Sequence, residues 1–461
     1  MVHTLPRTSN YLQRVEVFPV NLEKGTINVN IVFGKDWQVT ERVRFVLTFD
    51  DNVTTQEYSS QSTINDNTVK LDQVVVPNPT PWSPSSPNLH TLEVRWVDET
   101  YTQTLDAITV LMTFYWSFFY VLSFYITFFF FYMLEQKGSI WSSDNWKTLG
   151  PQNKYHATDF EWRDIQMERI QSPSHDVTLL VNAGVNYIRG AHYPQDQRFL
   201  DLCDENGIMI WSETLGPKVS VENLTNPYFL KYQVQAVNEM IDSAINNPSV
   251  VLWAFYNEGP SNNPEACPGY NVSASAIRQR DTTRYVTWAN NKLLQDVCLS
   301  NIGDIISFNS YPGWYEQLFN LSYVVEFWSN ISYFAQLQWP GKPFLISESG
   351  ASGIYEYRNT TPVEWSQMYH EQVVEAEITT MFVSPYISGM TMWQFADIKA
   401  NDQDTALCGR CDYIPNSNNC SYIDINCKRP GGENHKGGVD FWRRPKRAYQ
   451  VLKQLYKWWH F

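Results

Sequence analysis

The most constraining feature of the sequence is a series of short apolar runs that alternate with amphipathic stretches after about residue 165. Near-continuous apolar strands separated by helices are typical of a parallel sheet buried on both faces. The expected strands are 185–190, 208–213, 250–258, 284–289, 304–311, 343–350 and 390–395, and the clearest expected helices are 228–246 and 361–380. Residues 165–458 therefore predict an α/β fold, a (β/α)8 TIM barrel whose first strand is not legible but should lie between residues 141 and 170.

Residues 11–105 carry a different pattern, in which apolar and polar side chains alternate strictly. The clearest alternation lies over 27–33, 43–49 and 92–96, with polar turns between the runs. Period-two runs at a spacing of about ten residues are typical of a small β-sandwich. We therefore expect an immunoglobulin-like β-sandwich in front of the barrel.

A polar or aromatic side chain stands at or just after the end of nearly every apolar run of the expected barrel. These residues are Arg189, His192, Glu213, Asn257, Glu258, Asn309, Tyr311, Glu348 and Trp393. The carboxyl ends of parallel barrel strands meet at one mouth, where barrel enzymes carry out their chemistry. The pattern therefore predicts an active site.

Glu258 and Glu348 are the two carboxylates best placed for catalysis. Cleavage of a glycosidic bond needs one carboxyl that protonates the leaving oxygen and a second, ionised one that attacks C1 or activates water. The alternative for either residue alone is a salt bridge at a strand end. The pair, with Asn257 beside Glu258, favours glycoside hydrolysis.

Several stretches of the chain resemble glycoside hydrolase family 2. They are Arg189-Gly-Ala-His-Tyr-Pro, Trp253-Ala-Phe-Tyr-Asn-Glu258, Ile346-Ser-Glu348-Ser-Gly, Met392-Trp393-Gln-Phe-Ala-Asp397 and the segment from Trp82, which resembles the end of that family's immunoglobulin-like domain. The resemblance implies a retaining exo-β-glycosidase with Glu258 as acid/base and Glu348 as nucleophile. It also implies that Asn257 hydrogen-bonds the sugar 2-hydroxyl.

His192 and Trp393 are further candidates for contact with the sugar. The resemblance favours His192 as a substrate ligand over a satisfied strand-end histidine, and Trp393 as a sugar platform over a core tryptophan. The 18 Trp and 27 Tyr of the chain agree with a carbohydrate-handling cleft, because aromatic rings offer apolar faces with polar edges.

A basic loop near the end of the chain bears on the substrate. Arg429, Asn434 and Lys436 resemble the loop with which β-glucuronidases hold the substrate carboxylate, and the segment from Phe308 to Tyr311 resembles the same enzymes. A lysine ammonium and an arginine fork complement an anionic sugar. The alternatives are a basic loop before a surface helix, or a β-galactosidase-like enzyme, which would not need Lys436.

Two departures from the family lead to a second interpretation. The family's N-terminal jelly-roll domain and the first barrel strand are both expected to be missing. The chain would then be a catalytically impaired carbohydrate-binding or membrane-tethered fragment. If it is complete, we expect a homo-oligomer.

Residues 107–134 contain no charged side chain and are long and apolar enough for a transmembrane helix. Thirteen of these 28 residues are aromatic, however, which is unusual for such a helix. The segment is therefore a candidate membrane span or a gene-model artefact.

Cysteines and glycosylation motifs indicate the compartment. Four of the seven cysteines, Cys408, Cys411, Cys420 and Cys427, lie close together and favour a disulfide-stapled loop over a zinc site. Asn-X-Ser/Thr motifs begin at Asn52, Asn223, Asn271, Asn320, Asn330, Asn359 and Asn419. Together they predict a glycoprotein that is secreted, lysosomal or extracellular. We expect no cofactor and no metal ion, and the net charge of −14 disfavours a nucleic-acid partner.

Overall fold

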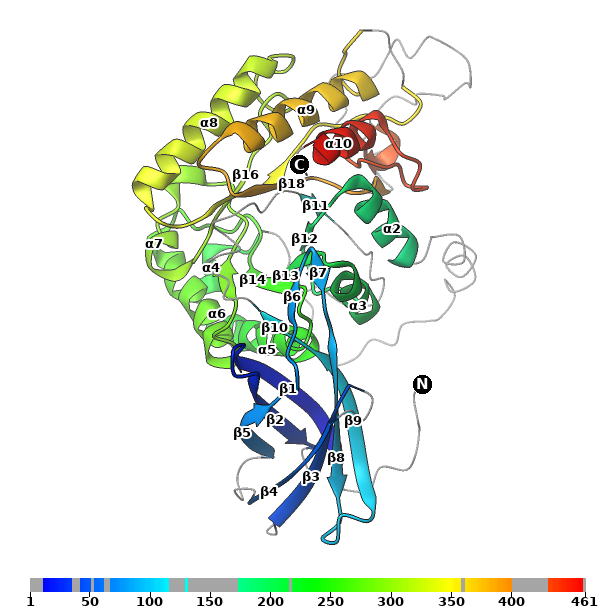
Figure 1. Cartoon of the computed structure of the whole chain (residues 1–461). Helices are drawn as coiled ribbons and strands as arrows, with labels where there is room; N and C mark the ends of the chain where they lie inside the picture. The colour runs from blue at the N-terminus through cyan, green and yellow to red at the C-terminus, as the bar shows by residue number, and fades with distance from the viewer. Residues whose placement is uncertain are drawn as a thin grey trace, which may run out of the picture.

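The computed structural model describes residues 11–34, 42–50, 54–61, 67–115, 129–131, 173–214, 218–357, 361–399 and 430–458. These residues form two domains, a β-sandwich and an α/β barrel that follows it in the chain (Figure 1). The predicted fold class is therefore confirmed.

Two antiparallel sheets make up the sandwich. The first has the order β1-β2-β5, from β1 (Leu12–Asn21), β2 (Thr26–Phe33) and β5 (Thr68–Val75). The second has the order β4-β3-β8-β9, from β3 (Arg42–Phe49), β4 (Thr54–Gln61), β8 (His90–Val97) and β9 (Thr104–Met112). The alternating apolar side chains of both sheets form one buried core, because successive side chains of a strand point to opposite faces.

Eight parallel strands form the barrel. They are β11 (Phe129–Phe131), β12 (Tyr187–Gly190), β13 (Met209–Thr214), β14 (Val250–Phe255), β15 (Tyr285–Thr287), β16 (Ile306–Asn309), β17 (Phe344–Ser349) and β18 (Gly389–Met392). Their order is β15-β14-β13-β12-β11-β18-β17-β16. A parallel bridge between Asn290 and Phe308 joins the two end strands and closes the barrel.

The first barrel strand corrects a prediction. Residues 141–170, where we expected it, lie outside the described residues, but β11 occupies its position between β12 and β18. The expectation of a barrel without its first strand is therefore wrong. The strand was not legible because its run is uniformly apolar and carries no turn signal of its own.

The apolar segment 107–134 also differs from prediction where it is described. Its start continues β9, which pairs with β8 and extends the sandwich past residue 105. β10 (Phe114–Tyr115) and β11 are also strands. No helix among the described residues is long and apolar enough to cross a membrane.

Helices surround the barrel strands (Figure 1). They are α2 (Pro173–Ala183), α3 (Gln197–Asn206), α4 (Val221–Thr225), α5 (Pro227–Ala244), α6 (Cys267–Arg280), α7 (Leu299–Ile302), α8 (Leu321–Gln338), α9 (Gln367–Val383) and α10 (Arg447–Trp458). Local capping sets their starts. Asn226 caps α5 through a bond from the Tyr228 amide, and Ser366 caps α9, which is why α9 starts later than predicted.

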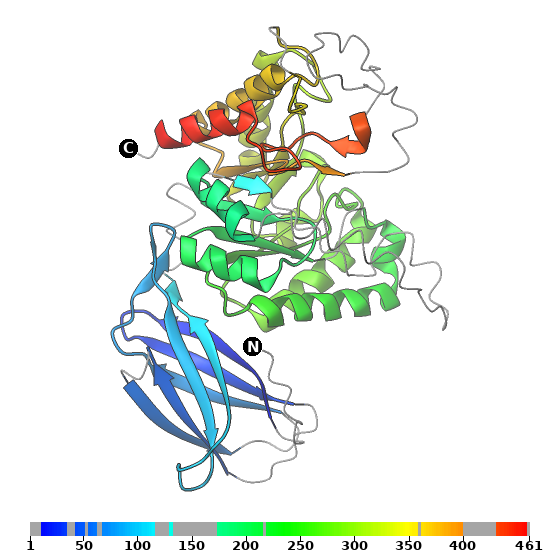
Figure 2. The same cartoon turned by 90° about the vertical axis from the view of Figure 1, so that its right-hand side faces the viewer.

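The sandwich is fastened to the side of the barrel by polar contacts. β6 (Pro81–Ser83) and β7 (Ser86–Pro87) reach toward the barrel (Figure 2), and the Trp82 indole N–H donates to the Asp204 carbonyl at 3.0 Å. Glu16 of β1 pairs with Arg280 of α6 at 2.8 Å. These contacts fix the orientation of the two domains.

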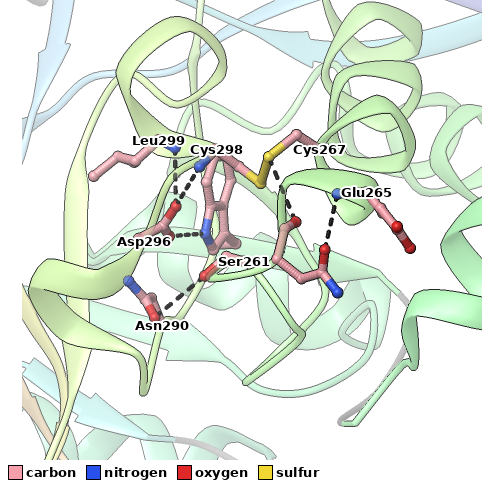
Figure 3. The surroundings of a disulfide bond; sticks show 9 residues. Ser261, Glu265, Cys267, Asn290, Asp296, Cys298 and Leu299 are labelled. Carbon is pink, nitrogen blue, oxygen red and sulfur yellow. Dashed lines mark hydrogen bonds between the residues drawn. A yellow bond between two sulfur atoms is a disulfide. The ribbon is translucent and has the colours of Figure 1, made fainter.

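One disulfide lies within the described residues, between Cys267 and Cys298 (Figure 3). Neither cysteine belongs to the close group that suggested a stapled loop. That group, Cys408 to Cys427, lies outside the described residues, so neither the stapled loop nor its zinc alternative is tested.

Candidate active site

Strand ends bring the predicted polar residues to one mouth of the barrel. Arg189 stands on β12, Asn309 ends β16 and Glu348 lies near the end of β17, while Asn257 and Glu258 follow β14. Four of these five residues are buried, and the fifth, Glu258, is partly exposed. A barrel that gathers charged side chains at its carboxyl end has the architecture of an enzyme site.

Arg189 is the centre of this site. Its guanidinium binds both carboxylate oxygens of Glu213, at 2.8 and 3.0 Å. A third nitrogen contact reaches Glu348 at 2.9 Å, and a fourth reaches Asn257 Oδ1 at 2.7 Å. A buried charge of this kind requires such a full set of partners.

Glu213 is the permanent counter-ion of Arg189. Burial works in the opposite direction, but the charges of Arg189 and His192 lower the pKa of the Glu213 carboxyl to about 2. Glu213 therefore stays ionised, and much of the charge of Arg189 is balanced by it.

Glu348 sits between two donors. Arg189 donates to its Oε1 at 2.9 Å, and the Tyr311 hydroxyl donates to its Oε2 at 2.6 Å. Burial raises the pKa of the Glu348 carboxyl above its usual value; Arg189, His192 and the Tyr311 bond oppose this rise, and the charge of Glu258 adds to it. Hydrogen bonds connect Glu348 to Glu258 through Arg189, Asn257 and Asn309.

Glu258 is held differently. The Asn309 amide donates to its Oε1 at 3.1 Å and to Asn257 Oδ1 at 3.2 Å. Ser347 Oγ in turn donates to Asn309 Oδ1 at 2.7 Å, which fixes the orientation of that amide. The backbone of Glu258 has a φ of 53°, in the left-handed region that a non-glycine residue seldom adopts.

His192 and Trp393 stack beside this cluster. Their ring centroids lie 5.2 Å apart with an interplanar angle of 23°. His192 Nδ1 lies 3.4 Å from Glu213, which joins the stacked pair to the Arg189 centre. Both rings therefore stand at the mouth of the barrel, as predicted.

Lys436 approaches the site from the loop after β20 (Glu433–Asn434). Its Nζ lies over the rings of Trp314, Tyr311 and Tyr315 at 4.4, 4.8 and 4.8 Å. Tyr311 is also the donor to Glu348, so one side chain touches both the lysine and the carboxylate. Such contacts stabilise a buried ammonium through the negative faces of the rings.

The loop that carries Lys436 is well anchored. Asn434 Oδ1 accepts a bond from the Lys436 amide at 3.2 Å, and the Lys436 carbonyl accepts one from Gln394 at 3.0 Å. Asp397 binds the nearby Gly437 amide and the buried Lys446 ammonium, at 2.8 and 2.6 Å. Arg429, the other predicted cation, lies outside the described residues.

Sequence reasoning undervalued three residues of this site. From the sequence, Arg189 and Asn309 are strand-end polar groups without an assigned role, and Glu213 is as readily a buried buttress as a functional residue. Their signal was present, since a charged residue inside an apolar run is almost never buried without partners. The partners themselves come from four different strands and could not be paired without the fold.

Two parts of the chain match family descriptions. Residues 149–417 match "Glycosyl hydrolases family 2, TIM barrel domain", and residues 11–109 match "Glycosyl hydrolases family 2". The second match covers the sandwich, and the expected absence of the family's N-terminal jelly-roll domain is not confirmed.

Curated relatives and solved structures agree with these matches. The β-glucuronidase of Mus musculus is 27% identical over 306 residues, which is 66% of this chain and 43% of the relative. The chain thus spans about two fifths of the length of that relative.

Two solved structures share the fold. A family 2 β-galacturonidase of Eisenbergiella tayi bound to galacturonate is 25% identical with a TM-score of 0.73. The matched region covers 98% of this chain and 73% of the galacturonidase chain. A Bifidobacterium dentium β-glucuronidase complexed with coumarin-3-O-glucuronide has a TM-score of 0.72 at 18% identity, covering 97% of this chain and 67% of that one. With a family description matched over more than half its length, the chain belongs to glycosyl hydrolase family 2.

Proposed function

We propose that the protein is a retaining exo-β-glycosidase that cleaves β-glucuronides or closely related uronic acid glycosides. Tyr311 carries this proposal, because it contacts Lys436 and donates to Glu348. Lys436 would bind the carboxylate of the sugar and Glu348 would attack its C1 atom. Both residues would then lie on the same wall of the pocket, beside Tyr311.

In the first step, Glu348 acts as the nucleophile. Its carboxylate attacks C1, the bond from C1 to the leaving oxygen breaks, and a covalent glycosyl-enzyme forms. Arg189 and Tyr311 support this role because both donate to the ionised form. Rigid donors of this kind hold the attacking oxygen in position before the substrate arrives.

Glu258 is the acid and then the base. It protonates the leaving oxygen as the C1 bond breaks, and afterwards takes a proton from the water that releases the sugar from Glu348. Its partial exposure supports this assignment, because the leaving group and the water must both reach it.

The remaining residues bind the sugar. Asn257 accepts at Oδ1 from Arg189 and Asn309, so we propose that its Nδ2 donates to the 2-hydroxyl. His192 and Trp393 form a stacked wall against the sugar ring. The carboxylate of the sugar is bound by Asn434, Lys436 and Arg429. The ammonium of Lys436 supplies positive charge to this contact.

A substrate panel tests the proposal. The full chain is assayed with aryl β-glucuronide, β-galacturonide and β-galactoside that share one leaving group, and the assay is repeated with Lys436→Ala. We expect a preference for a uronide that Lys436→Ala removes. Preferential cleavage of the galactoside, unaffected by Lys436→Ala, would favour the β-galactosidase-like alternative, and binding without turnover would favour the catalytically impaired one.

We also propose that the protein works in the secretory pathway, in lysosomes or outside the cell. The Cys267–Cys298 disulfide supports an oxidising setting, and the glycosylation motifs at Asn271, Asn320 and Asn330 are exposed. A mass shift on glycan removal from the native protein would test this, and sizing of the same sample would test the proposed homo-oligomer.

A further inference from the structure

The Cys267–Cys298 disulfide joins the segment after β14, which contains Glu258, to the segment after β15. Figure 3 shows the surroundings of this disulfide. One cysteine begins α6, which follows the loop after β14, and the other precedes α7, which follows the loop after β15. We call residues 256–267 and 288–298 the paired loops. The disulfide joins their far ends across 31 positions of the chain.

Hydrogen bonds join the paired loops along their length. The Glu258 amide donates to the Ala289 carbonyl at 2.8 Å, and the Val297 amide donates to the Ser261 carbonyl at 2.9 Å. Between these, Ser261 Oγ donates to Asn290 Oδ1 at 3.4 Å. The loops therefore form one ladder, with Glu258 at one end and the disulfide at the other.

Asp296 fastens the disulfide end of the second loop. Its Oδ1 accepts from the amides of Cys298 and Leu299, at 2.8 and 2.9 Å, and its Oδ2 accepts from the Trp288 indole at 3.0 Å (Figure 3). Cys298 is 2% exposed, so this end is buried as well as bonded. Motion of the first loop is thereby tied to a fixed part of the barrel.

The backbone at Glu258 needs such support. Tyr256 and Glu258 both have left-handed backbones, with φ of 56° and 53°. Gly259 packs so closely on α6 that a Cβ there would lie 2.4 Å from the Tyr270 hydroxyl. Strained conformations persist only where their surroundings hold them, and α6 begins at Cys267.

Glu348 depends less directly on the paired loops, which are linked to it through Asn257 and Arg189. It lies on β17, and the carbonyls of Glu348 and Ser349 accept from the Ser310 and Trp393 amides, at 2.9 and 2.7 Å. Ser310 directly follows β16 and Trp393 directly follows β18, the two strands that lie beside β17 in the barrel. Loosening the paired loops should therefore move Glu258 and leave Glu348 in place.

We infer that Cys267 and Cys298 are positioning residues for Glu258, which they hold at the orientation needed for proton transfer to the leaving oxygen. This inference rests on the proposed function, in which Glu258 is the acid/base. Proton transfer matters most when the leaving group is a poor one, because a stable phenolate departs without protonation. A misplaced Glu258 should therefore slow bond cleavage in proportion to the basicity of the leaving group.

The test is the double variant Cys267→Ser/Cys298→Ser of the full chain. It is assayed under conditions in which circular dichroism shows that the variant is folded. We expect kcat/KM for a phenyl uronide to fall at least about tenfold more than that for a dinitrophenyl uronide, since acid catalysis supplies about 10² to 10⁴. Equal losses for both substrates would overturn the inference.

Two controls separate positioning from general destabilisation. Cys203→Ala removes the buried free thiol of α3, and Arg280→Ala weakens the contact between the domains. None of the contacts described above joins Cys203 or Arg280 to the paired loops. Both controls should leave the ratio of the two substrates unchanged, and a changed ratio in Arg280→Ala would contradict the inference.

Hydrogen exchange gives a readout that does not need activity. In the double variant the amides of Glu258 and Val297 should exchange faster, whereas those of Ser310 and Trp393 should not. Unchanged exchange at Glu258 would overturn the positioning role even if the enzyme were active. Failure of the unmodified protein to cleave any uronide would instead contradict the proposed function.

Discussion

The surroundings of Glu348 and Glu258 differ in a way that supports the different roles proposed for them. Glu348 is 5% exposed, lies within a strand and accepts bonds from a cation and a phenol. Glu258 is partly exposed, follows its strand on a left-handed backbone and accepts a bond from a neutral amide. In the proposed mechanism these surroundings suit Glu348 to be a fixed attacking group and Glu258 to be an accessible proton carrier.

The difference also shows how one barrel supports both roles. A strand fixes a side chain through the sheet on both sides, whereas a loop must be fixed by added links. Glu348 uses the first means, and Glu258 uses hydrogen bonds and a disulfide.

The largest effect is expected from Glu348→Gln. Removing the nucleophile should lower kcat by roughly 10⁵-fold with every leaving group, because no covalent intermediate can form. Steady-state kinetics with a dinitrophenyl and a phenyl uronide would measure this. Substantial residual turnover of either substrate, once contaminating enzyme is excluded, would show that the attacking group lies elsewhere.

A smaller and substrate-dependent effect is expected from Glu258→Gln. Cleavage of the phenyl uronide should slow by about 10² to 10⁴, while formation of the intermediate from the dinitrophenyl uronide should be nearly unaffected. Pre-steady-state bursts would separate the two steps. If both substrates lost the same factor, the contrast between the carboxylates would be wrong.

Arg189→Met tests the buried ion cluster through stability. Glu213 and Glu348 would be left without their shared cation, and removing one partner of a buried pair costs about 3 to 5 kcal/mol. Urea denaturation would measure this change. The control Arg278→Ala, at an ion pair with Asp304 whose side chains are 39% and 32% exposed, should cost no more than about 1 kcal/mol. Equal losses for the two variants would contradict a special role for Arg189.

The smallest expected effect is a pH shift in Tyr311→Phe. Burial already raises the pKa of Glu348, and loss of the hydroxyl removes one of the contacts that lower it. Activity needs ionised Glu348 and falls as the pH drops through this pKa, so the acid limb of kcat/KM should move to higher pH. A limb that stayed or moved to lower pH would refute the assigned bond.

Much of the fold was predictable from the sequence, for a physical reason. Buried parallel strands are apolar throughout, so 250–258 and 343–350 were legible, and alternation marked sandwich strands such as 43–49. β11 was not predictable, because a uniformly apolar stretch gives no sign of which three residues pair. A membrane helix and a buried strand share that composition.

The positions of the two proposed catalytic carboxylates at strand ends were predictable, but the residues that support them were not. Glu258 and Glu348 each follow an apolar run, a local signal that can be read along the chain. The bonds from Asn309 to Glu258 and from Tyr311 to Glu348 join residues 51 and 37 positions apart, and only the closed barrel brings them together. The Cys267–Cys298 pairing was equally hidden, since spacing alone does not give connectivity.

The most direct test of the account is mechanism-based labelling of the full chain with a fluorinated aryl β-glucuronide that forms its glycosyl-enzyme faster than it releases it. We expect one covalent sugar per chain, located by peptide mass spectrometry on Glu348, and no label in Glu348→Gln. A label on Glu258, or turnover of the reagent without any covalent intermediate, would contradict it.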